Sequence, residues 1–247
     1  MKNTVLITGA SNGIGKGLAY EYAKRGCDIA LLARNEDSLQ NIVSDIQKRF
    51  PTVKAKYYIL DVTKTDTVLT TLEQAFEEFG KMDIVIANAG IAGGGKAGSG
   101  KLSEDIAIFE TNVIGAIATI DSAVNLLKRQ GEGQIVAISS VAAFRGLPGA
   151  GAYCASKAAL STYMQSLQAE LQPTPISSTI LYPGYIDTDL NKNMKSRPFL
   201  ITVDEASPII ANLIARKVKR STVPVYPWKF IGTLLRVLPD SLFSAKK

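Results

Sequence analysis

The chain has 247 residues, 46% of them hydrophobic and 20% charged, a composition typical of one globular domain with little disorder. It contains two cysteines, Cys27 and Cys154, and no histidine. A disulfide framework, a metal site and histidine-based catalysis are therefore poor interpretations. The net charge of +6 is concentrated in residues 216–247, which hold eight basic residues and one acidic residue. Because the rest of the chain is close to neutral and has no basic stripe, we expect no nucleic acid partner.

Short apolar runs rich in Val, Ile and Leu alternate along the chain with longer segments of helical periodicity. The predicted strands are residues 4–8, 28–33, 54–60, 84–87, 134–139, 177–182 and 222–226. The predicted helices are residues 13–25, 36–50, 65–79, 103–128, 151–172 and 204–218. This alternation predicts an α/β fold, a doubly wound parallel sheet with helices on both faces.

Domain organisation follows from the same pattern. We predict a single dinucleotide-binding catalytic domain over residues 1–226 and a basic amphipathic C-terminal tail over residues 227–247. The first residues enter an apolar strand without the pattern of a secretory signal, so we expect a cytoplasmic protein.

The segment from Thr8 to Gly15 lies between the first predicted strand and the first predicted helix. Its three glycines allow a tight turn and a close approach of backbone N–H groups to a pyrophosphate at the helix N-terminus. The pattern predicts a dinucleotide site, and the alternative is a glycine-rich turn that binds nothing.

Tyr153 and Lys157 are four residues apart on a predicted helix, so their side chains share a face. A fixed positive charge favours the phenolate form of a tyrosine and moves its pKa toward the working range of a proton donor. Alone, this spacing is a weak signal. Ser139 and Ser140, just upstream, are candidate partners.

With these motifs in order, residues 3–226 resemble the short-chain dehydrogenase/reductase family. The matching elements are Thr8–Gly15, Asp61 with Val62, Asn88–Gly90, Asn112, Ser140, Tyr153 with Lys157, and Pro183–Thr188. The chain departs from the family at Ala87, where a second Asn is common. The resemblance implies a single-domain Rossmann-like fold and hydride transfer between a nicotinamide dinucleotide and a carbonyl or secondary alcohol substrate.

The resemblance also implies four catalytic residues. Tyr153 would exchange a proton with the substrate oxygen, and Lys157 would hold the cofactor ribose and lower the pKa of Tyr153. Ser140 would hydrogen-bond the same oxygen, with Ser139 as the alternative. Asn112 would position a water that links Lys157 to solvent, or would simply be a satisfied buried amide.

The implied cofactor-binding residues extend over most strand ends. They are Gly9, Ser11, Asn12, Gly13, Ile14, Gly15, Arg34, Asp61, Val62, Asn88, Ala89, Gly90, Tyr153, Lys157, Pro183, Gly184, Ile186 and Thr188. Ala33 stands where an NAD-specific enzyme usually carries a carboxylate, and Arg34 offers a cation for the 2′-phosphate of NADP. We therefore expect NADP rather than NAD. Against this, Arg34 could be a solvated charge, and Asn12 stands where some NADP-preferring relatives carry Arg or Lys.

The remaining partners are less defined. Residues 189–200 mix apolar and basic side chains at the variable lid position of the family and suit a partly apolar substrate. Residues 227–247 predict either a helix that covers the substrate site or an oligomer partner, or a segment in peripheral contact with a membrane. The resemblance implies a homodimer or homotetramer. The competing functions are a non-catalytic NADP-binding sensor or scaffold, and a membrane-associated interaction protein.

Overall fold

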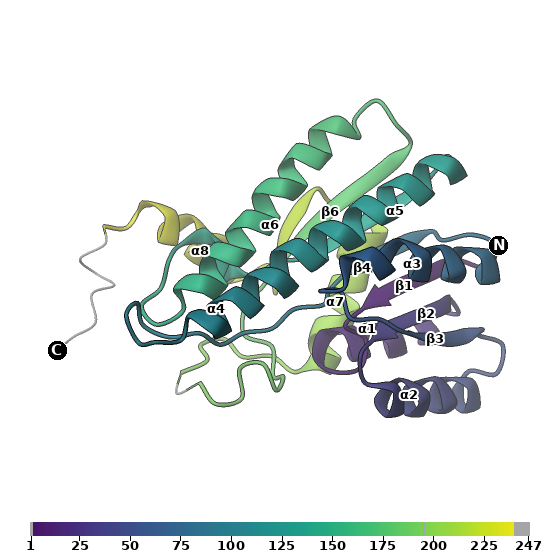
Figure 1. Ribbon diagram of the computed structural model, residues 1–247, viewed down its shortest axis with the longest axis horizontal. Coiled ribbons are helices and arrows are strands. Elements are labelled where there is room, and N and C mark those ends of the chain that lie inside the picture. The colour runs from purple at the N-terminus through teal and green to yellow at the C-terminus, as the bar shows by residue number, and fades with distance from the viewer. Residues whose placement is uncertain (1, 195, 240–247) are drawn as a thin grey trace.

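The structure is a computed structural model, and it describes residues 2–194 and 196–239 (Figure 1). Seven parallel strands form one sheet in the order β3-β2-β1-β4-β5-β6-β7. The strands are β1 (Thr4–Thr8), β2 (Asp28–Ala33), β3 (Ala55–Ile59), β4 (Ile84–Ala87), β5 (Gly133–Ile138), β6 (Ile176–Pro183) and β7 (Arg220–Val223). The doubly wound parallel sheet predicted from the sequence is confirmed.

Helices cover both faces of the sheet (Figure 1). They are α1 (Gly13–Lys24), α2 (Glu36–Arg49), α3 (Thr65–Phe79), α4 (Leu102–Phe109), α5 (Ala116–Gln130), α6 (Gly151–Glu170), α7 (Val203–Ala215) and α8 (Trp228–Val237). Helices α1, α2 and α7 pack on one face, and α3, α5 and α6 on the other. Each strand contributes side chains to both layers because successive side chains point to opposite faces of the sheet. In β1, Val5 and Ile7 face the first layer and Leu6 faces the second.

Strand order reverses between β1 and β4, because β1 pairs with β2 on one side and with β4 on the other. The connections that leave the carboxyl ends of these two strands run in opposite directions over the sheet. A crevice therefore forms at this edge, where ligands bind in folds of this class.

The predicted helix 103–128 is interrupted in the structure. Helix α4 ends at Phe109, a π-helical turn (η1) spans Glu110–Gly115, and α5 follows. Periodicity alone did not reveal the extra residue in this turn. The continuous stretch Leu102–Gln130 is long and apolar enough to span a membrane, but half of its apolar window is buried in the fold, as in a core helix.

The seventh strand also differs from the prediction. It runs over Arg220–Val223 instead of residues 222–226. Pro224 follows directly and has no N–H to donate to a neighbouring strand, so the ladder ends there. The next residues lead into α8, whose first residue Trp228 is buried. The boundary at residue 226 between domain and tail stays a prediction.

Candidate active site

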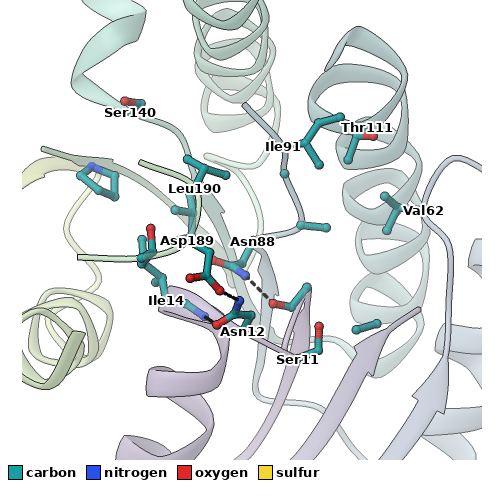
Figure 2. Close-up of a pocket in the computed structure, with 18 of the residues that line it drawn as sticks. Ser11, Asn12, Ile14, Val62, Asn88, Ile91, Thr111, Ser140, Asp189 and Leu190 are labelled. Carbon is teal, nitrogen blue, oxygen red and sulfur yellow. Dashed lines mark hydrogen bonds between the residues drawn. The ribbon is translucent and has the colours of Figure 1, made fainter. Parts of the chain in front are cut away.

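A cleft of about 360 Å³ lies at the carboxyl ends of the central strands (Figure 2). Of the residues predicted to bind the cofactor, Gly15 alone does not line it. The cleft is also lined by residues that were not predicted to bind the cofactor, namely Ala33, Asn35, Leu60, Ile91, Thr111, Ile138, Ser139, Asp189, Leu190 and Asn191. Among them, Ser139 is the alternative catalytic serine, and Asp189, Leu190 and Asn191 belong to the predicted lid. Most of the additional lining residues directly follow or precede a predicted residue, so proximity in the chain was the available signal.

The glycine-rich loop after β1 packs tightly against the loop after β4. Gly9 has a φ of +65°, and a Cβ placed on it would lie 2.7 Å from the Cα of Ala89. A Cβ on Gly15 would lie 2.3 Å from the carbonyl oxygen of Gly9. Only glycine fits at either position. Gly15 packs against the back of the loop and does not line the cleft.

The N-terminus of α1 faces the cleft through Gly13 and Ile14. The Oδ1 of Asn12 accepts a hydrogen bond from Gly13 N at 2.7 Å and caps the helix. The first turn of a helix leaves N–H groups unpaired and carries the positive end of the helix dipole. The loop and this helix end therefore fit a bound pyrophosphate.

Asn88 holds this loop in place. Its Nδ2 donates to the carbonyl oxygens of Thr8 at 2.9 Å and Gly9 at 3.2 Å. In return, the Oγ1 of Thr8 accepts from the backbone N–H groups of Asn88 at 3.1 Å and Ala89 at 3.2 Å. The ends of β1 and β4 are thus joined by side chains at the point where strand order reverses. Figure 2 marks the hydrogen bond that Asn88 makes with the glycine-rich loop.

The lid segment meets the same loop from the other side. The Nδ2 of Asn12 donates to Oδ2 of Asp189 at 2.6 Å (Figure 2). Leu190 and Asn191 extend this wall of the cleft, and the Nδ2 of Asn191 donates to the carbonyl of Ile186 at 2.8 Å. The predicted lid and the glycine-rich loop are therefore in direct contact.

The two candidate serines separate clearly in space. Ser140 caps a 3-10 turn (η2, Val141–Phe144), where its Oγ accepts from Ala142 N at 3.1 Å, and it also hydrogen-bonds the Tyr153 side chain. The Oγ of Ser139 instead donates to the carbonyl oxygen of Lys157 at 3.0 Å and lies 2.8 Å from the Oγ of Ser161. Ser140 is therefore the serine that is placed beside Tyr153.

Lys157 is buried beneath Tyr153. Its Nζ donates to the carbonyl of Ile138 at 3.0 Å and lies 6.0 Å from the centroid of the Tyr153 ring. Burial lowers the pKa of Lys157 to about 8. Burial also raises the pKa of Tyr153, although its hydrogen bond with Ser140 acts in the opposite direction. The expected lowering of the Tyr153 pKa is thus not met in this structure, because desolvation outweighs the favourable contacts.

Asn112 lies in the π-helical turn and is fully buried. Its Oδ1 accepts from Ile91 N at 2.8 Å, and its Nδ2 donates to Ile91 O at 2.9 Å and to the Oγ of Ser156 at 3.1 Å. Asn112 does not line the cleft, whereas its neighbour Thr111 does. The side chain joins the loop after β4 to α6 as a satisfied buried amide, and the water link to Lys157 stays a prediction.

The end of the cleft that is predicted to hold the adenosine is formed by residues that follow β2 and β3. Arg34 is 69% exposed, and its Nη1 lies 4.0 Å from the Oδ2 of Asp61. Burial alone would raise the pKa of Asp61. Hydrogen bonds from Thr63 and the charges of Arg34 and Lys64 outweigh burial and hold this pKa below its usual value. No group of three or more potential metal-ligating side chains occurs among residues 2–194 and 196–239.

The sequence profile described as short chain dehydrogenase matches residues 3–198. The chain belongs to the short-chain dehydrogenase family. An uncharacterized oxidoreductase of Mycobacterium tuberculosis is 38% identical over 244 residues, which cover 98% of this chain and 96% of that protein. The family fold and the oxidoreductase class are therefore established for this chain.

Solved structures of short-chain dehydrogenases are similar over most of the chain. The alcohol dehydrogenase from Thermococcus sibiricus, complexed with 5-hydroxy-NADP, has a TM-score of 0.82 and 28% identity, and covers 90% of this chain and 96% of its own. A short-chain dehydrogenase/reductase from Burkholderia phymatum in complex with NAD has a TM-score of 0.85 over 96% of this chain and 92% of its own. At 21% identity, this second likeness concerns the fold alone.

Proposed function

We propose that the protein is an NADP(H)-dependent oxidoreductase that interconverts a carbonyl compound and a secondary alcohol. The observation that carries the proposal is the placement of Ser140, Tyr153 and Lys157 in one cleft with the glycine-rich loop. A binding module would not require a buried lysine beneath a tyrosine that is hydrogen-bonded to a serine.

The residues divide the work in the following way. A bound nicotinamide dinucleotide would supply or accept the hydride. The loop at Gly9–Ile14 and the N-terminus of α1 would hold its phosphates, and Thr188 and Ile186 line the same cleft after the end of β6. Tyr153 donates its proton to the substrate oxygen, and Ser140 orients that oxygen by a hydrogen bond. Lys157 supplies a positive charge near the phenol.

The raised pKa of Tyr153 suits reduction. The phenol stays protonated at neutral pH and is ready to donate. The reverse reaction, oxidation of the alcohol, needs the deprotonated form of Tyr153, so we expect its rate to increase as the pH rises.

The preference for NADP rests on Arg34. Its guanidinium lies at the adenosine end of the cleft, and the preceding Ala33 offers no carboxylate to a ribose hydroxyl. A planar cation fits a phosphate through paired hydrogen bonds. The Thermococcus structure, which holds an NADP derivative, supports this choice, and the Burkholderia structure with NAD keeps NAD as the alternative.

The test is a panel of aldehydes and ketones assayed by NADPH absorbance, with Tyr153→Phe as the matched variant. We expect wild type to reduce at least one carbonyl and the variant to lose about 10²-fold or more in kcat, the usual contribution of a general acid. Equal activity in both proteins would refute the role of Tyr153. NADPH binding without turnover on any carbonyl would favour the sensor or scaffold.

We also propose a homodimer or homotetramer in a cytoplasmic location. Leu102, Ile106, Phe109 and Ile114 are exposed along one stretch of helix from α4 into the π-helical turn, as an interface between copies would require. Both cysteines are free and buried, which supports a reducing compartment. Light scattering of wild type and Ile106→Ser tests the assembly, with a lower mass expected for the variant.

A further inference from the structure

Helix α8 is apolar on two faces. On its inner face Trp228 is buried, and Gly232 lies against the ring of Phe144, where a Cβ would come within 2.4 Å. On its outer face Phe230, Leu234 and Val237 are 69%, 51% and 74% exposed. A surface helix of a soluble protein normally presents polar side chains outward. An exposed apolar face of this kind marks a site of interaction with a protein or a membrane.

The lid also carries exposed apolar side chains, and it contacts α8 through Trp228. Leu190, Met194, Phe199 and Leu200 are exposed, and the ring of Phe199 meets that of Trp228 edge-on, with centroids 5.9 Å apart. Tyr226 and Phe230 extend the contact, with ring centroids 5.6 Å apart. We call these residues the α8–lid surface, formed by Leu190, Met194, Phe199, Leu200, Tyr226, Phe230, Leu234 and Val237. It holds more than half of the exposed large apolar side chains among the described residues.

This surface borders the Ser140 end of the cleft. Leu190 lines the cleft itself. The indole of Trp228 packs against Gly184, another lining residue, so closely that a Cβ there would lie 2.1 Å from its Nε1. Phe144, which α8 covers, ends the turn that Ser140 begins. Arg145 follows and donates to the carbonyl of Leu235 at 2.9 Å, so α8 is fastened beside the site.

Positive charge accompanies the apolar segments. Residues 189–200 contain three basic residues and one acid, and residues 228–247 contain four basic residues and one acid. The other basic segment is residues 216–227, with four basic residues and no acid, and in residues 1–188 and 201–215 acids outnumber bases. Apolar side chains flanked by lysine and arginine favour the headgroup region of an anionic membrane. A second copy is a poorer occupant, because a symmetric contact would bring the two positive segments together.

We infer that the α8–lid surface docks on an anionic membrane surface, with Phe230, Leu234 and Val237 entering the interface. The Ser140 end of the cleft then lies beside the bilayer, and the substrate is an apolar carbonyl compound that partitions into lipid. This statement about the substrate rests on the proposed function, whereas the docking does not.

The test is co-sedimentation of the full chain with phosphatidylcholine vesicles that contain or lack phosphatidylglycerol. We expect binding to the anionic vesicles, weakened by salt. The double variant Phe230→Ser/Leu234→Ser should bind about tenfold or more weakly, since it removes two apolar side chains that would enter the interface. The matched control Ile59→Ser/Leu69→Ser removes two exposed apolar side chains from β3 and α3 and should bind like wild type. Circular dichroism and NADPH binding confirm that each variant is folded.

The outcomes are distinct. Wild type that stays in the supernatant with anionic vesicles, or a double variant that binds them as wild type does, overturns the docking. A double variant that changes only the mass seen by light scattering assigns the surface to self-association and also overturns it. Vesicle binding without carbonyl reduction keeps the docking and refutes the proposed function. Reduction of soluble ketones without vesicle binding keeps the proposed function and overturns the docking.

The substrate has a test of its own. We expect faster reduction of a long-chain ketone in anionic than in neutral vesicles, and equal rates would contradict an apolar substrate taken from the bilayer.

Discussion

The ammonium of Lys157 donates to the backbone carbonyl of Ile138 at 3.0 Å, and both groups lie inside the protein. One neutral acceptor does not replace the hydration that a charged amine loses, so the pKa of Lys157 falls to about 8. Lys157, which the proposed site needs for its charge, therefore lowers the stability of the folded state.

We predict that Lys157→Met raises the free energy of unfolding at pH 7 by about 1–3 kcal/mol while it abolishes turnover. The unfolded chain binds the proton of this lysine up to about pH 10.5, and the folded chain only up to about pH 8. Between these values the unfolded state holds more protons, so wild type gains stability as the pH rises. The difference between variant and wild type should shrink from pH 8 to pH 10.5. Urea titrations across this range measure it, and a constant difference would contradict the burial argument.

The two adjacent serines should respond differently to alanine. Ser140→Ala removes the hydroxyl beside Tyr153 and should lower kcat/KM for reduction about 10²-fold, with little change in stability. Ser139→Ala removes a buried bond to the carbonyl of Lys157 and should lower the free energy of unfolding by about 1–3 kcal/mol. We expect less than about a tenfold effect on kcat, because Ser161 still donates to that carbonyl. The reverse pattern would make Ser139 the substrate-binding serine.

Asn88→Ala should weaken dinucleotide binding without touching the reacting groups. The amide holds the carbonyls of Thr8 and Gly9, and its loss leaves two acceptors unpaired behind the phosphate loop. Each lost bond destabilises the loop by about 0.5–1.5 kcal/mol. Fluorescence titration with NADPH should show a Kd raised about tenfold, with kcat at saturation nearly unchanged. A fall in kcat at an unchanged Kd would instead assign Asn88 to the chemistry.

Arg34→Asp should reverse the cofactor preference. Loss of a charged partner of the 2′-phosphate should raise the Kd for NADPH about 10–100-fold, because hydrogen bonds to charged groups contribute about 1.5–3 kcal/mol. The Kd for NADH should change far less. Arg49→Asp is the matched control, since this arginine is also exposed and lies outside the cofactor cleft. If Arg34→Asp keeps the wild-type ratio of the two Kd values, Arg34 does not select the cofactor.

The fold could be predicted from the sequence because buried parallel strands are continuous apolar runs. Strands β1, β2 and β4 match the predicted bounds residue for residue. The π-helical turn could not be predicted. It contains Asn112, whose side-chain amide bonds the backbone of Ile91, 21 residues earlier in the chain. Periodicity within one helix carries no information about such a distant partner.

The candidate site, like the fold, could be predicted only in part. Motif spacing identified most of the residues that line the cleft, because they follow strand ends that the sheet brings together. It could not separate residues that face the cleft from those that support it from behind, such as Gly15 and Asn112. Nor could it show that burial raises the pKa of Tyr153, since desolvation depends on the packing of the whole site.

Ser139 and Ser140 point to opposite sides of the chain at the end of β5, as neighbouring residues of an extended strand do. A shift of β5 by one residue against β4 and β6 would exchange them, and Ser139 would then meet Tyr153. The choice of the serine that meets the substrate is therefore made by the pairing of Ile138 with Leu181, and by the bond from Ser139 N to the carbonyl of Leu181 at 2.8 Å. Strand alignment in the centre of the sheet thus acts as a determinant of catalytic identity, and substitutions along β6 can alter the chemistry without reaching the cleft.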